Sequence, residues 1–152
     1  MIPGGEPAFN LASARAAAES GALESWVHAY LNGPGRNAAF SEGLALQPRY
    51  WRGPVDASLA KLERTCGPEP DLPFRVSSES WNSRIAALRS SFTGVEDHAP
   101  LIVQYERGRL RIRDGNHRHA AMVSLSIESC PVILWYASLE EYRHHEARAF
   151  TL

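Results

Sequence analysis

The stretch Pro100–Tyr136, PLIVQYERGRLRIRDGNHRHAAMVSLSIESCPVILWY, decides the fold of this chain. The runs Leu101–Glu106 and Arg109–Arg113 are joined by an Arg-Gly dipeptide, and Leu110 and Ile112 alternate with arginines in the second run, a pattern typical of a β-hairpin. The segment His117–Ser126 predicts a helix whose small alanines allow close packing on a sheet. The nearly unbroken apolar run Cys130–Tyr136 predicts a strand covered on both faces. The order strand, strand, helix, strand indicates a domain that mixes α and β structure.

The length and composition of the chain are those of a globular protein with a core of its own. The chain has 152 residues, of which 44% are hydrophobic, and its net charge of −1 gives no global basic excess that would favour nucleic acid. No apolar run is long enough for a membrane span, and the N-terminus lacks a signal-peptide pattern. Cys66 and Cys130 fit no zinc spacing and leave both reduced thiols and a disulfide open. We therefore expect a cytoplasmic protein.

The N-terminal third of the sequence has a helical pattern. Leu11–Glu19, with Asn10 as its cap, and Ala22–Leu31 predict two helices, and Asn37–Glu42 predicts a short third one. The segment Arg49–Arg52 then alternates basic and aromatic residues, which can stack on a base or contact a phosphate. The same residues can simply anchor a loop on the domain, and this is the interpretation that we favour.

Two short strands and a helix are predicted before the hairpin. Val55–Leu59 and Leu72–Val76 have strand-like composition, and Cys66–Pro70 between them is a clear break. A serine before Glu79 can cap a helix over Glu79–Phe92, whose apolar residues recur at helical spacing.

The densest cluster of chemically capable side chains is Asp114-Gly115-Asn116-His117-Arg118, where the second hairpin strand meets the following helix. A helix N-terminus preceded by a glycine is suited to an anion, and Arg118 adds a fork for phosphate oxygens. Asp114 is positioned to hold a magnesium ion or to orient a hydroxyl, and His117 can donate to a phosphate or move a proton. Asn116 or Asp114 can also cap the helix, so a plain turn with a cap stays an alternative.

The same stretch resembles a known family. Pro100–Tyr136 looks like the core of the ParB/sulfiredoxin superfamily, in which a P-hydrophobic-V strand, a hairpin, a G-x-x-R loop opening a helix and a VPVIV-like strand recur in this order. Gly115–Arg118 matches G-x-x-R, and Asp114–Arg118 is similar to the D-G-H-H-R of free serine kinases. Val55–Leu62 and Ser78–Phe92 resemble the first strand and the preceding helix of the superfamily.

The resemblance implies a fold class and a division of the chain. The fold is α/β (α+β), a small mixed sheet flanked by helices, with residues 1–53 as an N-terminal helical extension and 54–152 as a nucleotide-binding domain. Sulfiredoxin chemistry is not expected, because Asn116 stands where that branch has its cysteine and Cys130 is expected in the core. Partition proteins bind CTP through a similar motif and carry a helix-turn-helix and a dimerisation region further on. Only about fifteen residues follow the last core strand here, so centromere binding by that route is not expected.

The kinase-like branch of the family implies a nucleotide, ATP or ADP with CTP as a further candidate, together with Mg²⁺. The expected reaction is phosphoryl transfer to a small hydroxyl-bearing substrate, or nucleotide hydrolysis. The resemblance assigns phosphate binding to four consecutive residues: Gly115, Asn116, His117 and Arg118. Asp114 would hold the metal or the substrate, and His117 would act on the transferred group. The candidate for the glutamate that activates the hydroxyl is Glu79, with Glu63 and Glu69 as alternatives.

Two other functions stay open from the sequence. A ParB-like DNA-binding protein or nuclease would use the arginine-rich hairpin, although Arg109 and Arg111 are more simply explained as a solvated strand face. A non-catalytic nucleic-acid adaptor would use the same hairpin together with Arg49–Arg52, and a degenerate domain would only mediate protein contacts through the N-terminal helices. Nucleic acid is therefore the less favoured partner, and the oligomeric state is open. The remaining histidines, His119 and the pair His144 and His145 on a last predicted helix over Leu139–Phe150, are expected at the surface.

Overall fold

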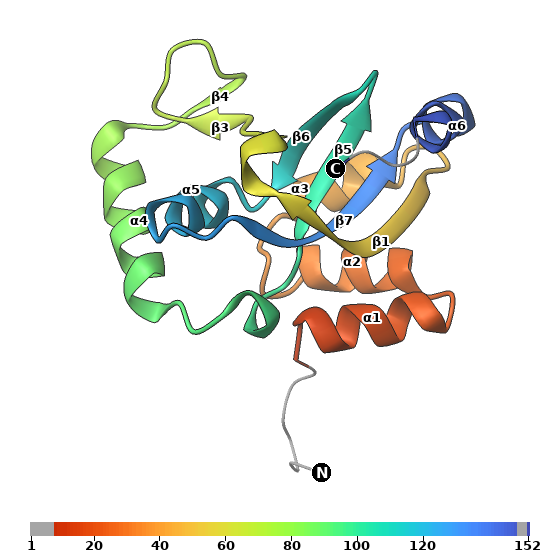
Figure 1. The fold of residues 1–152 in the computed structure, drawn as a ribbon, viewed down its shortest axis with the longest axis horizontal. Helices are drawn as coiled ribbons and strands as arrows, with labels where there is room; N and C mark the ends of the chain where they lie inside the picture. The colour runs from red at the N-terminus through yellow and green to blue at the C-terminus, as the bar shows by residue number, and fades with distance from the viewer. Residues whose placement is uncertain (1–7, 149–151) are drawn as a thin grey trace.

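A mixed five-stranded sheet forms the centre of the molecule, with helices on both of its faces (Figure 1). The computed structural model describes residues 8–148 and 152. In spatial order the strands of the main sheet are β1 (Tyr50–Ser58), β7 (Ser129–Tyr136), β5 (Leu101–Glu106), β6 (Arg109–Asp114) and β2 (Leu62–Glu63). A small separate sheet pairs β3 (Cys66–Gly67) with β4 (Phe74–Arg75). The predicted fold class, a small mixed sheet flanked by helices, is confirmed.

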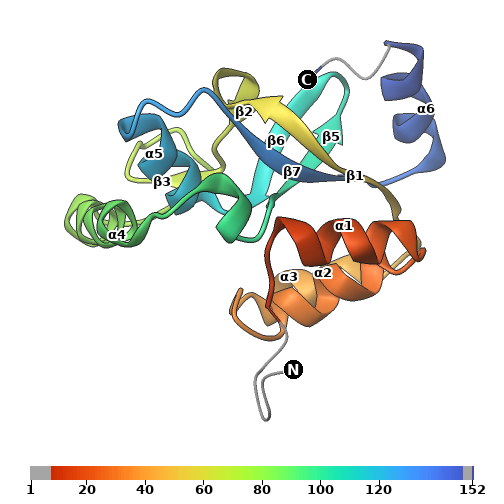
Figure 2. The same cartoon turned by 60° about the horizontal axis from the view of Figure 1, so that its bottom comes forward.

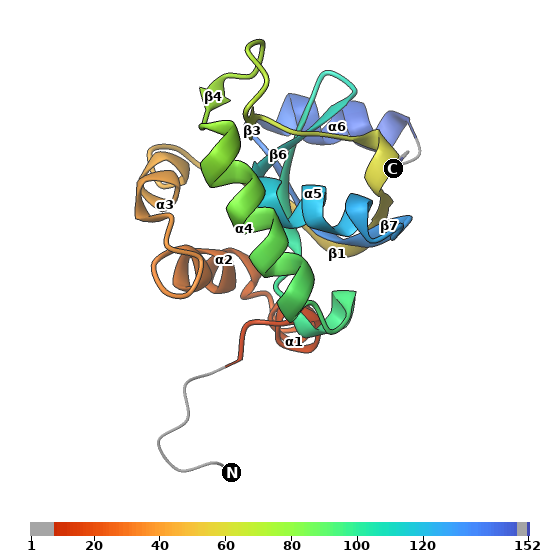
Figure 3. The same cartoon turned by 90° about the vertical axis from the view of Figure 1, so that its left-hand side faces the viewer.

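The helices cover the sheet in three groups. Their bounds are α1 (Leu11–Glu19), α2 (Leu23–Leu31), α3 (Ala38–Leu44), α4 (Ser78–Ser91), α5 (Asn116–Ser124) and α6 (Leu139–Ala147), with 3₁₀ turns η1 (Leu59–Lys61) and η2 (Val95–Asp97). Helices α1 to α3 lie together on one side of the sheet (Figure 2). Helix α4 packs along α5 (Figure 3). Helix α6 packs against β5 and β7. None of the described helices is long and apolar enough to cross a membrane.

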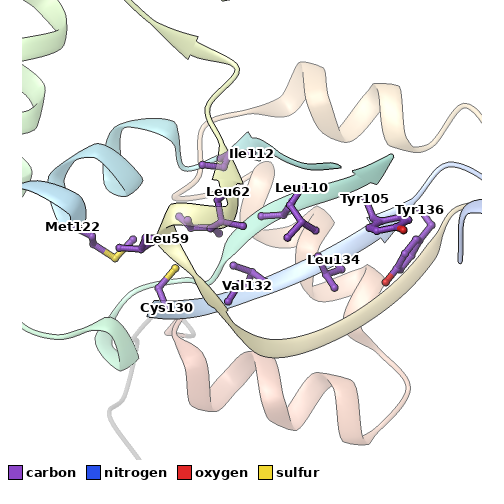
Figure 4. Close-up of a cluster of buried hydrophobic side chains, with 13 residues drawn as sticks. Leu59, Leu62, Tyr105, Leu110, Ile112, Met122, Cys130, Val132, Leu134 and Tyr136 are labelled. Carbon is purple, nitrogen blue, oxygen red and sulfur yellow. The ribbon is translucent and has the colours of Figure 1, made fainter. Parts of the chain in front are cut away.

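The central strand β7 explains why the sequence is continuously apolar there. It is hydrogen-bonded on both sides, antiparallel to β1 and parallel to β5. Successive side chains point to opposite faces of a strand. Val132 and Leu134 therefore join the core cluster on one face (Figure 4), while Ile133 and Trp135 join the cluster beneath α1 and α2. Both faces of β7 are buried, so polar residues have no place on either side.

Several element boundaries in the structure differ from the predicted ones. The first strand begins at Tyr50 rather than Val55, and the predicted division between residues 1–53 and 54–152 falls inside it. The strand predicted at Leu72–Val76 shrinks to the two residues of β4, because β4 pairs only with the equally short β3 and its side chains are exposed.

The elements with the strongest local signals match their predictions. Helix α1 has the predicted bounds, and Asn10 caps it in a reciprocal bond pattern with Ser13. The hairpin of β5 and β6 forms as predicted. Helix α5 begins at Asn116, one residue before the predicted start. The predicted end of the last helix at Phe150 lies outside the described residues.

Two of the three histidines that were predicted at the surface are buried. His145 is fully buried, its Nδ1 lies 2.7 Å from the Tyr136 hydroxyl, and its ring stacks on Tyr105 at 4.1 Å between centroids. His144, the next residue, is exposed as predicted, because neighbouring positions on a helix point in different directions. His119 is 7% exposed, and its Nε2 lies 2.9 Å from the carbonyl oxygen of Leu59. Both errors arise because each helix turns its histidine toward the sheet.

Both cysteines are free thiols within the described part of the chain. Cys130 lies in the core cluster of β7, as expected, and burial raises the pKa of its thiol to about 12. A thiol with that pKa is protonated at neutral pH and is a poor nucleophile. The structure therefore gives Cys130 a packing role.

Candidate functional site

A cleft of about 640 Å³ opens between α3, the flap of residues 65–76 that carries β3 and β4, and the loop between β6 and α5. The residues of its floor come from the main sheet: Gln104, Arg113 and Trp135. The volume lies within the range of small-molecule sites in proteins. Four predicted site residues line it together: Asp114, Gly115, Asn116 and His117.

Gly115 gives the loop its shape. Its φ of +102° lies in the left-handed region, and a Cβ on this residue would clash with the side chain of Leu101. Gly115 is also the N-cap of α5, and no side chain among the described residues caps this helix. The alternative that Asn116 or Asp114 serves as the cap is therefore wrong. The first N–H groups of a helix have no partner within the helix, and the first two residues of α5, Asn116 and His117, line the cleft, which suits an anion.

Asp114 and Arg118 form an ion pair behind the loop. Arg118 Nη2 lies 3.3 Å from Asp114 Oδ2, and Arg118 Nη1 donates to the carbonyl oxygen of Ala99. The other oxygen of Asp114 accepts a hydrogen bond of 3.2 Å from Asn37 in the α2–α3 connection. Arg118 lies 6.0 Å from the Tyr30 ring and lines a small apolar cavity between α4, α5 and β7. Its guanidinium thus holds the loop against the N-terminal helices, and Asp114 faces the cleft.

The side chain of Asn116 has a structural partner. Its Oδ1 accepts hydrogen bonds from the backbone N–H groups of Thr65, at 2.8 Å, and Cys66, at 3.2 Å. The residue is 8% exposed, so this pair of bonds is shielded from water and ties the flap to the start of α5. Any contact of Asn116 with a phosphate therefore falls to its backbone N–H. The partners lie fifty residues away, and nothing local in the sequence indicates them.

His117 lies at the edge of the cleft and is half-buried. Its ring packs on Trp81 of α4 with 4.5 Å between centroids. Burial lowers the pKa of His117, and the positive charges of Arg84 and Arg64 lower it further. The imidazole is therefore neutral at pH 7 and can accept a proton.

The candidate glutamates are not among the described residues that line the cleft. Glu79 is exposed in the first turn of α4, where its charge suits the helix dipole. Glu63 pairs with Arg109, and Glu69 pairs with Arg64. These hydrogen-bonded guanidinium groups lower the pKa of both carboxyls. Asp114 is the one carboxylate in the described lining of the cleft.

Two arginines of the cleft were not predicted as site residues. Arg113, at the end of β6, donates its Nε–H to Gln104 Oε1 at 2.8 Å. Arg49 donates to the carbonyl oxygens of Leu44 and Gly43 and lies 5.2 Å from the ring of Trp135. Neither has an ion-pair partner within residues 8–148 and 152. The feature of the sequence that could have indicated Arg113 as a site residue is its position directly before the Asp-Gly loop.

The other arginines of the hairpin fit the simpler interpretation. Arg109 and Glu63 approach to 2.5 Å, and Arg111 and Glu106 to 3.2 Å, all at partly or fully solvated positions. Such ion pairs are typical of a solvated strand face. They neutralise the two arginines and leave little positive charge there for a polyanion.

The metal prediction can be compared with the donor atoms present. Within the described residues there is no group of three or more His, Cys, Asp or Glu side chains that could hold a metal ion. A magnesium ion bound with a nucleotide usually takes one or two carboxylates from the protein and its other ligands from phosphate and water. The single carboxylate of Asp114 fits a magnesium ion that is bound together with a nucleotide.

Comparisons with known proteins do not place the chain in a family. No protein-family model and no curated protein matches the chain. Among solved structures the chain is similar to a Pnob8-like ParB-N domain, with a TM-score of 0.34 and 17% sequence identity. The match covers 68% of this chain and 34% of that chain, so it spans about a third of that protein's length. A likeness of this size does not assign the chain to a family.

Proposed function

We propose that this protein is a ParB-like domain that binds ATP or ADP, with Mg²⁺, in the cleft beside the Asp114–Arg118 loop. The observation that carries the proposal is the uncapped N-terminus of α5 behind Gly115, which opens into a cleft of about 640 Å³. Open N–H groups and the helix dipole favour an anionic group such as a phosphate. The resemblance of the loop to the D-G-H-H-R motif supports the same ligand.

Aromatic side chains in the cleft support a ligand with a planar ring. Phe40 of α3 and Trp135 of the floor lie 6.0 Å apart between ring centroids, and Phe74 of the flap is 61% exposed at the cleft. A nucleotide base gains from contact with such faces, whatever its identity. An exposed phenylalanine on the flap is the kind of residue that a bound base would cover. CTP is accordingly a ligand to test beside ATP and ADP.

The residues of the cleft support a division of roles. The backbone N–H groups of Asn116 and His117 would receive phosphate oxygens, and Asp114 would hold a magnesium ion that arrives with the nucleotide. When bound, such an ion neutralises phosphate charge. Arg118 would act through Asp114, because two of its nitrogens bond that carboxylate and the Ala99 carbonyl.

The reaction we propose is phosphoryl transfer to a small hydroxyl-bearing substrate, or to water. The acceptor oxygen would bond to the terminal phosphorus as the bridging bond breaks, and the acceptor proton would pass to His117. A neutral His117 is suited to this step, since its lowered pKa leaves it unprotonated at pH 7. Glu79 lies outside the described lining, so we give it no part in the step.

A thermal-shift panel tests the binding. ATP, ADP, CTP, GTP and a short DNA duplex would each be added to the protein, with and without magnesium. We expect a nucleotide to raise the melting temperature and DNA to have no effect. A shift with DNA alone would instead favour the DNA-binding alternative, which the ion-paired Arg109 and Arg111 do not support.

A second measurement separates binding from chemistry. The variant His117→Gln keeps a polar side chain of similar size but has no proton-accepting group near neutral pH. We expect it to retain most of the nucleotide-induced shift and to lose about 100-fold in the rate of phosphate release or transfer. Equal rates in the variant and the wild type would rule out His117 as the base and leave the domain as a binding protein.

A further inference from the structure

We propose that Arg113, oriented by Gln104, is the residue of the cleft that receives the oxyanion of the ligand, and that a phosphate group binds to its two terminal nitrogens. The proposal rests on the proposed function, because it names the group that takes the negative charge of the nucleotide. It also moves that role from Arg118, which the sequence favoured, to a residue that no motif includes.

The bond between the two side chains leaves the guanidinium ready for a ligand. Arg113 Nε–H donates to Gln104 Oε1 at 2.8 Å. Gln104 is 5% exposed on β5, the strand next to β6, so its own position is held by the core. Nη1 and Nη2 of Arg113 make no hydrogen bond with any described residue. A guanidinium fixed through Nε keeps four N–H donors on its two terminal nitrogens. One N–H of each nitrogen points outward in parallel, the geometry that binds phosphate in a bidentate manner.

Chemistry also decides which way the Gln104 amide points. An arginine nitrogen can only donate, so the amide oxygen must face Arg113. The amide nitrogen of Gln104 then points away, and it has no acceptor among the described residues.

The charges along β6 single out the same residue. Three arginines alternate on one face of this strand, and Arg109 and Arg111 are both ion-paired. Arg113 has no carboxylate partner in the described part of the chain, and it is the one of the three that lines the cleft. It is half-buried, and burial together with the charge of Arg111 lowers its pKa. A partly desolvated cation without a counterion is costly, and an anionic ligand would remove that cost.

The experiment uses inorganic pyrophosphate as the probe and calorimetry as the measurement, because pyrophosphate carries the charge of a nucleotide without its base. The variants are Arg113→Gln and Gln104→Glu, and the second places a carboxylate against the Nε of Arg113, where it neutralises the charge that would attract the ligand. We expect each to weaken pyrophosphate binding by about tenfold or more. The control Arg111→Gln lies on the same strand face and outside the described lining of the cleft. It should change the affinity by less than about twofold.

Two further readouts separate binding from folding. The melting temperature without ligand should be unchanged or higher in Gln104→Glu, since a buried ion pair replaces an unpaired charge. The dependence of pyrophosphate affinity on salt should be weaker in Arg113→Gln than in the wild type. A residue with only a structural role would lower the melting temperature and leave the salt dependence of binding unchanged.

The outcomes distinguish this inference from the proposed function. If Arg113→Gln binds pyrophosphate and ATP as the wild type does, the inference is overturned and nucleotide binding stands. If pyrophosphate binding depends on Arg113 but ATP does not compete for the site, the anion receptor stands and the nucleotide function is wrong. If the wild type binds neither compound, both are overturned.

Discussion

Helices α5 and α6 each follow a strand of the main sheet directly, yet their N-termini differ. Ser138 caps α6 by accepting a hydrogen bond of 3.2 Å from the backbone N–H of Glu141, and Glu140 and Glu141 place negative charge in its first turn. Helix α5 begins behind Gly115, with no side-chain cap among the described residues and no acidic residue in its first turn. The N-terminus of α6 is capped by its own side chains, whereas the N-terminus of α5 has no such cap, which fits the anionic ligand that we propose.

The two helices are alike on their inner sides. Each buries one histidine against the sheet, His119 in α5 and His145 in α6, and each ring has a hydrogen-bond partner there. The difference at the N-termini is therefore not a difference in how well the helices are packed. It separates a helix whose start is capped by its own residues from one whose start borders the candidate site.

The largest effect is expected at the start of α5. Gly115→Ala should reduce the free energy of unfolding by about 3 kcal/mol, because the new Cβ meets Leu101 and φ is positive. Chemical denaturation measures this loss. The control Gly43→Ala, in helix α3 with open space at its Cβ, should be neutral or slightly stabilising. Equal stability of Gly115→Ala and the wild type would mean that the loop tolerates a different conformation.

The next effect concerns the flap of residues 65–76, which Asn116 at the start of α5 helps to hold. Asn116→Ala should cost about 2 kcal/mol, since the buried N–H groups of Thr65 and Cys66 lose their acceptor. Limited proteolysis should also cleave the variant faster within residues 65–76. The matched control is Asn32→Ala. The Asn32 side chain makes its hydrogen bonds at an exposed position, so this variant should lose less free energy of unfolding than Asn116→Ala. An uncleaved flap in Asn116→Ala would show that other contacts hold it.

A smaller effect is expected at the start of α6. Ser138→Ala removes the cap and should lower the free energy of unfolding by about 1 kcal/mol. Nucleotide affinity should not change, because Ser138 does not line the cleft beside the α5 loop and has no ligand role in our proposal. A loss of affinity in Ser138→Ala would contradict the contrast between the two helices.

The smallest effect concerns the buried histidine of α5. Burial lowers the pKa of His119 in the folded protein, so the unfolded chain binds the proton more readily. The stability from this residue is therefore fully present above the unfolded pKa of about 6.5 and is lost as the pH falls below it. Unfolding curves at pH 7 and pH 5 measure this effect. The free energy of unfolding should fall less between the two pH values in His119→Gln than in the wild type, and the glutamine can still donate to the Leu59 carbonyl. An identical loss in both proteins would assign the acid sensitivity to other groups, such as His117.

The sequence by itself determined the secondary structure wherever the signal was local. The cap at Asn10, the hairpin around Gly108 and the apolar run of β7 each lie within a dozen residues, and each element formed as predicted. The turn before α5 was local as well, since Gly115 marks both the turn and the start of the helix. These features follow from backbone geometry and hydrophobic periodicity, which are properties of neighbouring residues.

The tertiary structure alone decided what each side chain of the site contacts. Asn116 bonds to a flap fifty residues away, and Arg118 turns behind the loop to Asp114 and Ala99. Arg113 stays unpaired within the described residues, while Arg109 and Arg111, identical in type and on the same face, find carboxylates. The position of a partner depends on how distant elements pack, and a strand pattern of alternating arginines contains no information about that packing.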